Sequence, residues 1–197
     1  DVLVNKNTIS EIETTTEENY ARPYGIIVGG SADASSITVR RNNLLLDVSP
    51  GQRTESAVGI GSGASETLDA SENWWGSKSG PNNADNTFLA PGEAEQGANV
   101  PDNVNFTPWL NASTDNNGQP FAPVTNSSGG QFASIQSAVD AASTDDTIEV
   151  KSGEYEETVE IDQGVRLVGS GPGRTSVAPD SGSAIEIQGN TQDIQDL

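Results

Sequence analysis

The chain contains no cysteine, no histidine and no methionine among its 197 residues. Disulfide bonds, thiol nucleophiles, histidine-based triads and metal sites built on histidine or cysteine are therefore excluded within it. Aromatic residues make up 5% of the chain, which is low for a globular core but sufficient for a thin, repetitive one. No apolar run approaches the roughly 20 residues that a helix needs to cross a bilayer, so the sequence predicts no membrane-spanning segment.

Basic residues are also scarce. Lys and Arg number 9 against 29 Asp and Glu, and the formal net charge is -20. Such a surface repels phosphates, which argues against a nucleic-acid partner. The acidic residues are spread along the whole length, and an evenly acidic surface favours solubility in strong brine, where repulsion is screened. The composition therefore predicts a halophilic source; an acidic mesophilic surface protein is the alternative.

Short strand-like segments recur in the first part of the chain. DVLVNKNTI (1–9), SITVRRNNL (36–44) and TLDASENWW (67–75) align with apolar residues two positions apart, as a strand with one buried face requires. A second series, YGIIVGG, VGIGSG and AIEIQG, begins at Tyr24, Val58 and Ala184. Strands of two classes that return in the same order predict a chain winding through successive stacked coils.

The alignment brings Asn7, Asn42 and Asn73 to one position. Stacked coils place like residues above one another, so we expect these side chains to form a hydrogen-bonded ladder at a bend. Asparagine also tolerates the left-handed backbone that a sharp bend needs. We therefore interpret the three asparagines as structural rather than ligand-binding.

A different pattern opens the later part of the chain. In FASIQSAVDAA (132–142) the apolar residues fall on one helical face, which predicts a short helix. The strand-like segments TIEV (147–150), ETVEI (157–161) and VRLVG (165–169) follow it. A helix laid across the first coil would cover an open end that otherwise invites edge-to-edge aggregation. We therefore expect a capping helix near 132–142.

The run from Phe132 to Thr175 resembles the N-terminal start of pectin-lyase-like right-handed parallel β-helix proteins. The matching residues are Ile135, Gln136, Ala138, Val139, Asp146, Thr147, Ile148, Val150, Gly153, Tyr155, Glu157, Leu167 and Gly169. The run from Asn73 to Leu110, through NWWG, Gly80-Pro81 and NFTPWL, resembles the closing segment of bacterial and archaeal surface β-helix proteins. The resemblance implies an all-β fold, a right-handed parallel β-helix in two portions.

The closing segment precedes the opening segment, which reverses the order of a complete β-helix. We expect residues 1–110 to be the closing portion of one β-helix and residues 131–197 to be the capping helix and opening portion of the next. Residues 111–130, rich in Asn, Ser, Gly and Pro, have the composition of a linker. Either two incomplete domains are joined, or the chain is one repeat of a tandem array. Placing Leu197 before Asp1 continues strand, bend and strand, which favours the array.

N-x-S/T sequons occur at Asn105, Asn111 and Asn126, beside this linker and nowhere else in the chain. Such clustering beside a linker predicts, for an exported protein, that at least one of them is N-glycosylated; we expect this protein to be extracellular or on the cell surface.

Catalytic and metal-binding residues are not predicted. Enzymes of the resembled fold carry catalytic Asp, Arg or Gln on coils after the opening segment, but only 22 residues follow Thr175 and no esterase motif is present. In EYEETVEID (154–162) the carboxylates alternate with apolar residues, which predicts a solvated acidic face rather than an acid/base pair or cation site. Calcium needs six to eight converging oxygen ligands, and no D-x-D-x-D-G loop is present, so calcium binding stays open without a motif to support it. We expect a protein that is not an enzyme and that has no cofactor.

The tryptophans are the residues that suggest sugar stacking. Trp75 takes the inward position of Ile9 and Leu44 in the alignment, whereas Trp74 takes an outward position. Trp74 is therefore either a platform for a glycan or a side chain that packs under the closing strand around Trp109.

These patterns and the resemblance together favour a structural role. The expected function is a module of an extracellular or cell-surface fibre, sheath or adhesin of a halophilic archaeon, polymerising head to tail with copies of itself. The alternatives are a carbohydrate-binding surface module and a non-catalytic fragment of a polysaccharide-modifying enzyme.

Overall fold

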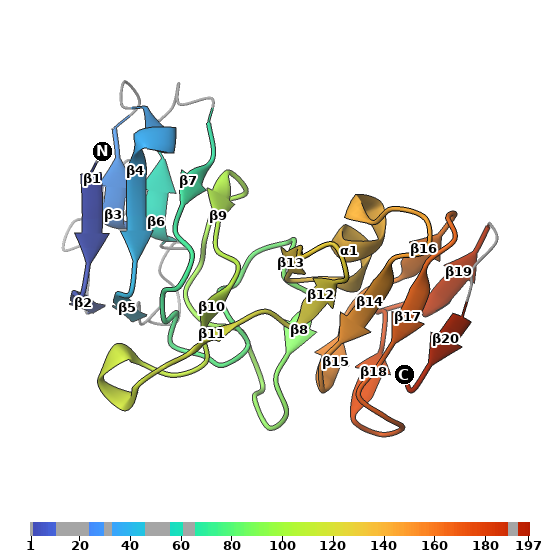
Figure 1. The fold of residues 1–197 in the computed structure, drawn as a ribbon. Coiled ribbons are helices and arrows are strands. Elements are labelled where there is room, and N and C mark those ends of the chain that lie inside the picture. The colour runs from blue at the N-terminus through green and yellow to red at the C-terminus, as the bar shows by residue number, and fades with distance from the viewer. Residues whose placement is uncertain (1, 11–23, 30–32, 46–55, 61–65, 189–192) are drawn as a thin grey trace. The chain divides into compact units, whose positions relative to one another are not determined.

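The structure is a computed structural model that describes residues 2–10, 24–29, 33–45, 56–60, 66–188 and 193–197. Within these residues the chain consists mostly of short strands with one short helix, so the fold is broadly all-β (Figure 1). Segments such as TIEV (147–150) suit short strands because apolar and polar residues alternate along them. Asp1, and with it the expected continuity from Leu197, lies outside the described residues.

The elements are short and separated by turns. The strands are β1 (Val2–Asn5), β2 (Thr8–Ser10), β3 (Tyr24–Val28), β4 (Ile37–Arg40), β5 (Asn43–Leu45), β6 (Ser56–Ile60), β7 (Leu68–Asp69), β8 (Phe88–Leu89), β9 (Val104–Asn105), β10 (Trp109–Leu110), β11 (Pro120–Phe121), β12 (Val124–Asn126), β13 (Gln131–Phe132), β14 (Thr147–Val150), β15 (Gly153–Tyr155), β16 (Val159–Ile161), β17 (Arg166–Val168), β18 (Thr175–Val177), β19 (Ile185–Ile187) and β20 (Asp193–Gln195). The helices are η1 (Ala34–Ser36), η2 (Thr114–Asn116) and α1 (Ile135–Ala141).

The chain forms two compact units. Unit 1 comprises residues 1–84 and 95–121, and unit 2 comprises residues 85–94 and 122–197. The change from unit 1 to unit 2 falls inside the predicted linker, 111–130, but this segment carries η2, β11 and β12. Its strands are paired, β11 with β10 and β12 with β13 and β14, which gives its backbone polar groups partners within the fold. Residues 85–94 belong with unit 2 and not with the residues that flank them in sequence.

In unit 1 the strands β1, β4, β7 and β9 lie side by side and run parallel (Figure 1). Val2 pairs with Ile37, Val4 pairs with Val39, and Thr38 pairs with Asp69, which is the register in which the three sequence segments align. β2 pairs with β5 and β3 with β6, also in parallel. The first strand triplet (β1, β2, β3) therefore recurs as a second triplet (β4, β5, β6).

Unit 2 repeats the same kind of order. The triplet β14, β15, β16 is followed by β17, β18, β19 and then by β20, and each strand pairs in parallel with its counterpart. The AIEIQG segment forms β19 here and pairs with β16, so the second sequence series is divided between the two units.

The helix α1 lies within the predicted range but is shorter than that range. It begins after Ser134, whose Oγ accepts a hydrogen bond from the backbone N–H of Ser137 at 3.3 Å, as an N-cap does. Phe132 pairs with Val124 as part of β13, so it is extended rather than helical. Ala142 ends the helix with extended backbone (φ -76°, ψ 152°).

Candidate functional site

The interior of unit 1 is covered at one end of the strand stack and open at the other. Val2, Ile37 and Leu68 form one interior column, and the exposed fraction falls from 54% at Val2 to 0% at Leu68. Ile9 is half-buried, whereas its partner Leu44 is fully buried. Among the described residues no strand pairs with the outer side of β1, β2 or β3. The first triplet is therefore an open edge with its apolar side chains incompletely covered.

In unit 2 the exposure of the interior apolar side chains rises toward the last strands, β19 and β20. Ile161 is fully buried in β16, but Ile187, which pairs with it from β19, is 57% exposed. Leu167 is fully buried in β17, and its partner Ile194 in β20 is half-buried. Within the described part of unit 2, the strands β18, β19 and β20 each have a partner on one side only. This is a second open edge.

The opposite end of unit 2 is closed, and each of its three strands is closed by a different group. β12 pairs antiparallel with β14, and β8 pairs antiparallel with β15. β16 is covered by a side chain from α1: Gln136 Oε1 accepts from the N–H of Glu160 at 2.7 Å, and Gln136 Nε2 donates to its carbonyl at 3.2 Å. The amide of Gln136 thus replaces the neighbouring strand that β16 lacks.

Phe88 seals the end of β15 by packing over Gly153 and Tyr155. The rings of Phe88 and Tyr155 lie 5.4 Å apart, and a Cβ at Gly153 would approach a ring carbon of Phe88 to 2.2 Å. The Tyr155 hydroxyl is shared between the carbonyl oxygens of Pro123 (3.1 Å) and Lys151 (3.0 Å). Burial first, and then the nearby charge of Glu157, raises the pKa of the Tyr155 hydroxyl. These contacts bury the edge of β15 at the closed end of unit 2.

Glu157 is an exception to the predicted solvated acidic face of EYEETVEID, whose other acidic residues, Glu154, Glu156, Glu160 and Asp162, are exposed. Its Oε1 accepts from Ile135 N at 2.8 Å and from Thr87 Oγ1 at 2.7 Å, and its Oε2 accepts from Gln136 N at 2.8 Å. The carboxylate satisfies N–H groups of the first turn of α1 that have no partner within the helix. Gln136 and Glu157 are both among the residues that carry the family resemblance, but only the tertiary contacts show what they do.

Asn7, Asn42 and Asn73 lie in one column of unit 1. Asn7 Nδ2 donates to Asn42 Oδ1 at 3.0 Å, and Asn42 Nδ2 donates to Asn73 Oδ1 at 3.0 Å. The backbone N–H groups of Asn7 and Asn42 donate to the same two oxygens. Asn42 and Asn73 are both fully buried, so these bonds satisfy amides that water does not reach.

The left-handed residue at each bend precedes the asparagine, which corrects the expected role of asparagine there. Lys6 (φ 56°), Arg41 (φ 57°) and Glu72 (φ 53°) have positive φ, and no ladder asparagine does. Lys6 N donates to Arg41 O at 3.1 Å, and Arg41 N donates to Glu72 O at 2.7 Å. The Arg41 guanidinium also pairs with the Glu72 carboxylate at 2.8 Å. The asparagine amides hold these strained bends in place.

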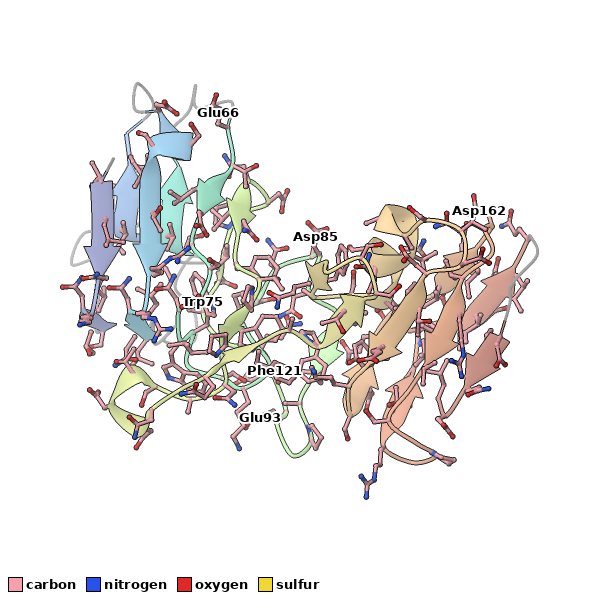
Figure 2. The ribbon with its side chains drawn as sticks, viewed as in Figure 1. Glu66, Trp75, Asp85, Glu93, Phe121 and Asp162 are labelled. Atoms are coloured by element: carbon pink, nitrogen blue, oxygen red, sulfur yellow. The ribbon has the colours of Figure 1, made fainter. Side chains whose placement is uncertain are left out.

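The tryptophans occupy different environments. Trp75 is fully buried in unit 1 (Figure 2). Trp109 is also fully buried; its Nε1 donates to Lys78 O at 3.0 Å, and a Cβ at Gly80 would lie 2.7 Å from its ring. Trp74 is half-buried, and its backbone pairs with Asn42 and Leu44. Of the three, Trp74 alone keeps part of its surface in solvent.

The three sequon asparagines differ in accessibility. Asn105 and Asn111 are exposed, and each uses Oδ1 to accept a backbone N–H, from Thr107 at 3.3 Å and from Gln119 at 2.9 Å. Asn126 is only 9% exposed, and its Oδ1 accepts from Gly130 N at 2.7 Å. The enzyme that attaches a glycan needs access to Nδ2, so the fold favours Asn105 and Asn111 over Asn126.

The perturbed acids of the structure are held by local hydrogen bonds. Donors from Ser127, the Ser143 backbone and Ser128 lower the pKa of Asp146. At Asp69 burial opposes ionisation, but hydrogen bonds from Ser71 and Arg40 outweigh it and lower the pKa. Both carboxylates therefore stabilise turns as anions. In the described residues no cluster of three or more carboxylates is arranged to hold a metal ion.

The described part of the chain also contains no helix that is both long enough and apolar enough to cross a membrane. No family model, curated protein or solved structure matches this chain.

Proposed function

We propose that the chain is a structural module of an extracellular or cell-surface fibre, sheath or adhesin. In this proposal the strand triplets are coils of right-handed parallel β-helices, of the pectin-lyase-like kind, and modules join head to tail. The observation that carries it is the pair of open edges, β1–β3 and β18–β20, at which interior apolar side chains such as Val2 and Ile187 are more than half exposed. Stacking the edge of one module on that of the next would bury these side chains.

The order of strands supports a join between the two edges. β20 has the place of β14 and β17 in unit 2, so a further strand would continue the series there. The proposal gives that place to β1 of another module.

The backbone of β1 supports the join as well. Lys6 N and Val4 O both face the second triplet, where they bond to Arg41 and Asn42. Because alternate residues of a strand point their N–H and C=O groups to opposite sides, those of Leu3 and Asn5 point to the open side. An added strand would satisfy the N–H and C=O of Leu3 and the N–H of Asn5, whose C=O already accepts from Asn7 Nδ2 at 2.9 Å. Contacts between two different edges do not close on themselves, so they generate linear polymers or tandem arrays.

The closed end of unit 2 supports an assembly with one direction. Because β12, β8 and Gln136 occupy the edges of β14, β15 and β16, addition to unit 2 is left to the β18–β20 side. The net charge of -20 fits a surface kept soluble in strong brine, which supports a halophilic source.

Sedimentation velocity of the purified chain in molar salt tests the proposal. We expect polymers whose size increases with protein concentration and which appear as thin filaments in electron micrographs. A second test joins two copies through Leu197 and Asp1. The fused edges should unfold at a higher temperature than the same edges in a single copy. A chain that stays monomeric at all concentrations, together with no gain in the fused pair, contradicts the proposal.

A carbohydrate-binding surface module is the second candidate, because the half-buried Trp74 presents part of an indole ring to solvent. Such a ring can stack on a sugar. Trp74→Ala should abolish glycan binding and leave assembly intact under this alternative. If Trp74 instead packs structurally, the substitution lowers the stability of unit 1 and does not alter glycan binding.

A further inference from the structure

Residues 85–94, which we call the latch segment, belong to unit 2, although the residues on both sides of them belong to unit 1. The chain therefore passes from unit 1 into unit 2 and back before it enters unit 2 a second time at residue 122. The latch segment contains β8, which pairs with β15 (Figure 1). A segment whose two ends are attached to one unit thus completes a sheet of the other unit.

The backbone of the latch segment occupies the edge of β15. The two strands are antiparallel, and the N–H of Glu156 donates to Thr87 O at 2.9 Å. Thr87 Oγ1 also donates to Glu157 Oε1 at 2.7 Å. The same carboxylate accepts from the first turn of α1, so α1 and the latch segment share one acceptor. Because the Glu156 N–H bonds to the latch segment, its rate of hydrogen exchange reports whether the segment is docked.

Phe88 is the largest side chain of the latch segment and is only 1% exposed. Its ring lies 5.4 Å from that of Tyr155. Gly153 lies directly beneath the segment, because an added Cβ there would stand 2.2 Å from the Phe88 ring and 2.7 Å from Leu89 O. The contact therefore depends on a glycine at 153 and on a large apolar side chain at 88. Burial of the Phe88 ring should supply most of the favourable free energy of docking.

Unit 1 holds the two ends of the latch segment close together. Asn82 Nδ2 donates to Asn99 Oδ1 at 2.7 Å, and the N–H of Asn82 donates to Ala98 O at 3.0 Å. Asn83 Nδ2 donates to Val100 O at 2.9 Å. While unit 1 is folded, these bonds reduce the latch segment to a short closed loop. If unit 1 unfolds, the segment becomes part of a longer flexible chain, and its docking on β15 costs more conformational entropy.

We propose that the latch segment couples the stability of the two units. It docks more tightly on β15 while unit 1 is folded, and its docking stabilises unit 1 by the same factor, because coupling between two equilibria is reciprocal. Unfolding of unit 1 weakens the protection of the β15 edge, and loss of the latch contacts weakens unit 1. This coupling is a property of the single chain and does not depend on the assembly proposed above.

Urea unfolding followed by tryptophan fluorescence tests the coupling, because all three tryptophans of the chain belong to unit 1. Phe88→Ala alters only unit 2, yet it should lower the fluorescence midpoint by about 0.5–1 M urea, which corresponds to about a tenfold smaller folding constant of unit 1. Phe132→Ala, the same change at a half-buried position of unit 2 outside the latch segment, is the matched control. It should leave the fluorescence midpoint unchanged.

Hydrogen exchange of the same full-length variants in dilute solution measures docking itself. The Glu156 amide should exchange about tenfold faster or more in Phe88→Ala than in the native chain, and at the native rate in Phe132→Ala. Thr87→Val, which removes the bond to Glu157, is a milder variant for the case that circular dichroism shows Phe88→Ala to be unfolded. It should change the folding constant of unit 1 and the exchange rate about threefold, in the same directions.

Two results overturn the proposal. A fluorescence midpoint that keeps its native value in a folded latch variant shows that the segment only seals unit 2. Unchanged exchange of the Glu156 amide in that variant shows that Phe88 and Thr87 do not hold the segment on β15.

Discussion

Replacing Val2 by Asp tests the open edge of unit 1 most directly. Val2 points into the unit in register with Ile37 and Leu68, yet is 54% exposed. Fully burying an aliphatic side chain contributes about 1.5–3 kcal/mol, so covering the exposed half of Val2 contributes about 1 kcal/mol. An unpaired carboxylate at the same place costs several kcal/mol instead. The two effects together should raise the dissociation constant between modules about 100-fold or more.

Leu3→Asp is the matched control. Leu3 is in the same strand, is 59% exposed and undergoes the same change of charge, but it pairs with Thr38 and points out of the unit. Sedimentation velocity should show polymers for the native chain and Leu3→Asp, and monomers for Val2→Asp at the same concentration. Both variants should retain the native circular dichroism spectrum, since both side chains are largely in solvent already.

The opposite edge permits a complementary experiment. Ile187→Asp should also give monomers, because Ile187 is 57% exposed in line with the buried Ile161. A mixture of Val2→Asp and Ile187→Asp still offers one intact edge of each kind, so it should form one-to-one dimers and stop there. Equal effects of Val2→Asp and Leu3→Asp, or no dimers in the mixture, would refute the reasoning.

The ladder, the closed end and the acidic turn give three further predictions. Asn42→Ala should lower the free energy of unfolding of unit 1 by about 3 kcal/mol, because it leaves several buried donors and acceptors unpaired. Asn7→Ala, at the exposed end of the ladder, should lower it by about 1 kcal/mol. Urea titration measures both changes. Glu157→Ala should speed hydrogen exchange of the first amides of α1 by about tenfold or more, and unchanged exchange would show that the carboxylate does not hold them. The folded-state pKa of Asp146 is lowered, so its contribution to stability is present above the unfolded value near 4 and is lost as the pH falls through the lower folded value. The unfolding temperature of Asp146→Asn should therefore depend less on pH in this acidic window than that of the native chain.

Local sequence patterns predicted a large part of the strand pairing. The alignment of the segments at Val2, Ile37 and Leu68 gives the observed register. Apolar residues occupy every second position of these segments, so a shift of the pairing by one residue would turn them all to the outside. The alignment also placed the three ladder asparagines at one position. It did not show that Lys6, Arg41 and Glu72 take the left-handed conformation, since none of these residue types signals positive φ.

The closed end of unit 2 could not be derived in the same way. Gln136 covers β16, and Glu157 holds the start of α1, through contacts between residues more than twenty positions apart. Residues 85–94 join unit 2 from a place in the sequence surrounded by unit 1. A short strand such as β8 carries no periodicity of its own, so nothing local indicates where it pairs.

The sequence by itself determined which side-chain chemistries are excluded and the register of the repeated segments. Those properties follow from composition and from side-chain periodicity, which are local, whereas the all-β class was implied by the family resemblance. Only the tertiary structure decided which edges are open and which are closed. These depend on residues distant in sequence meeting in space, and on which backbone groups still lack a partner once they have met.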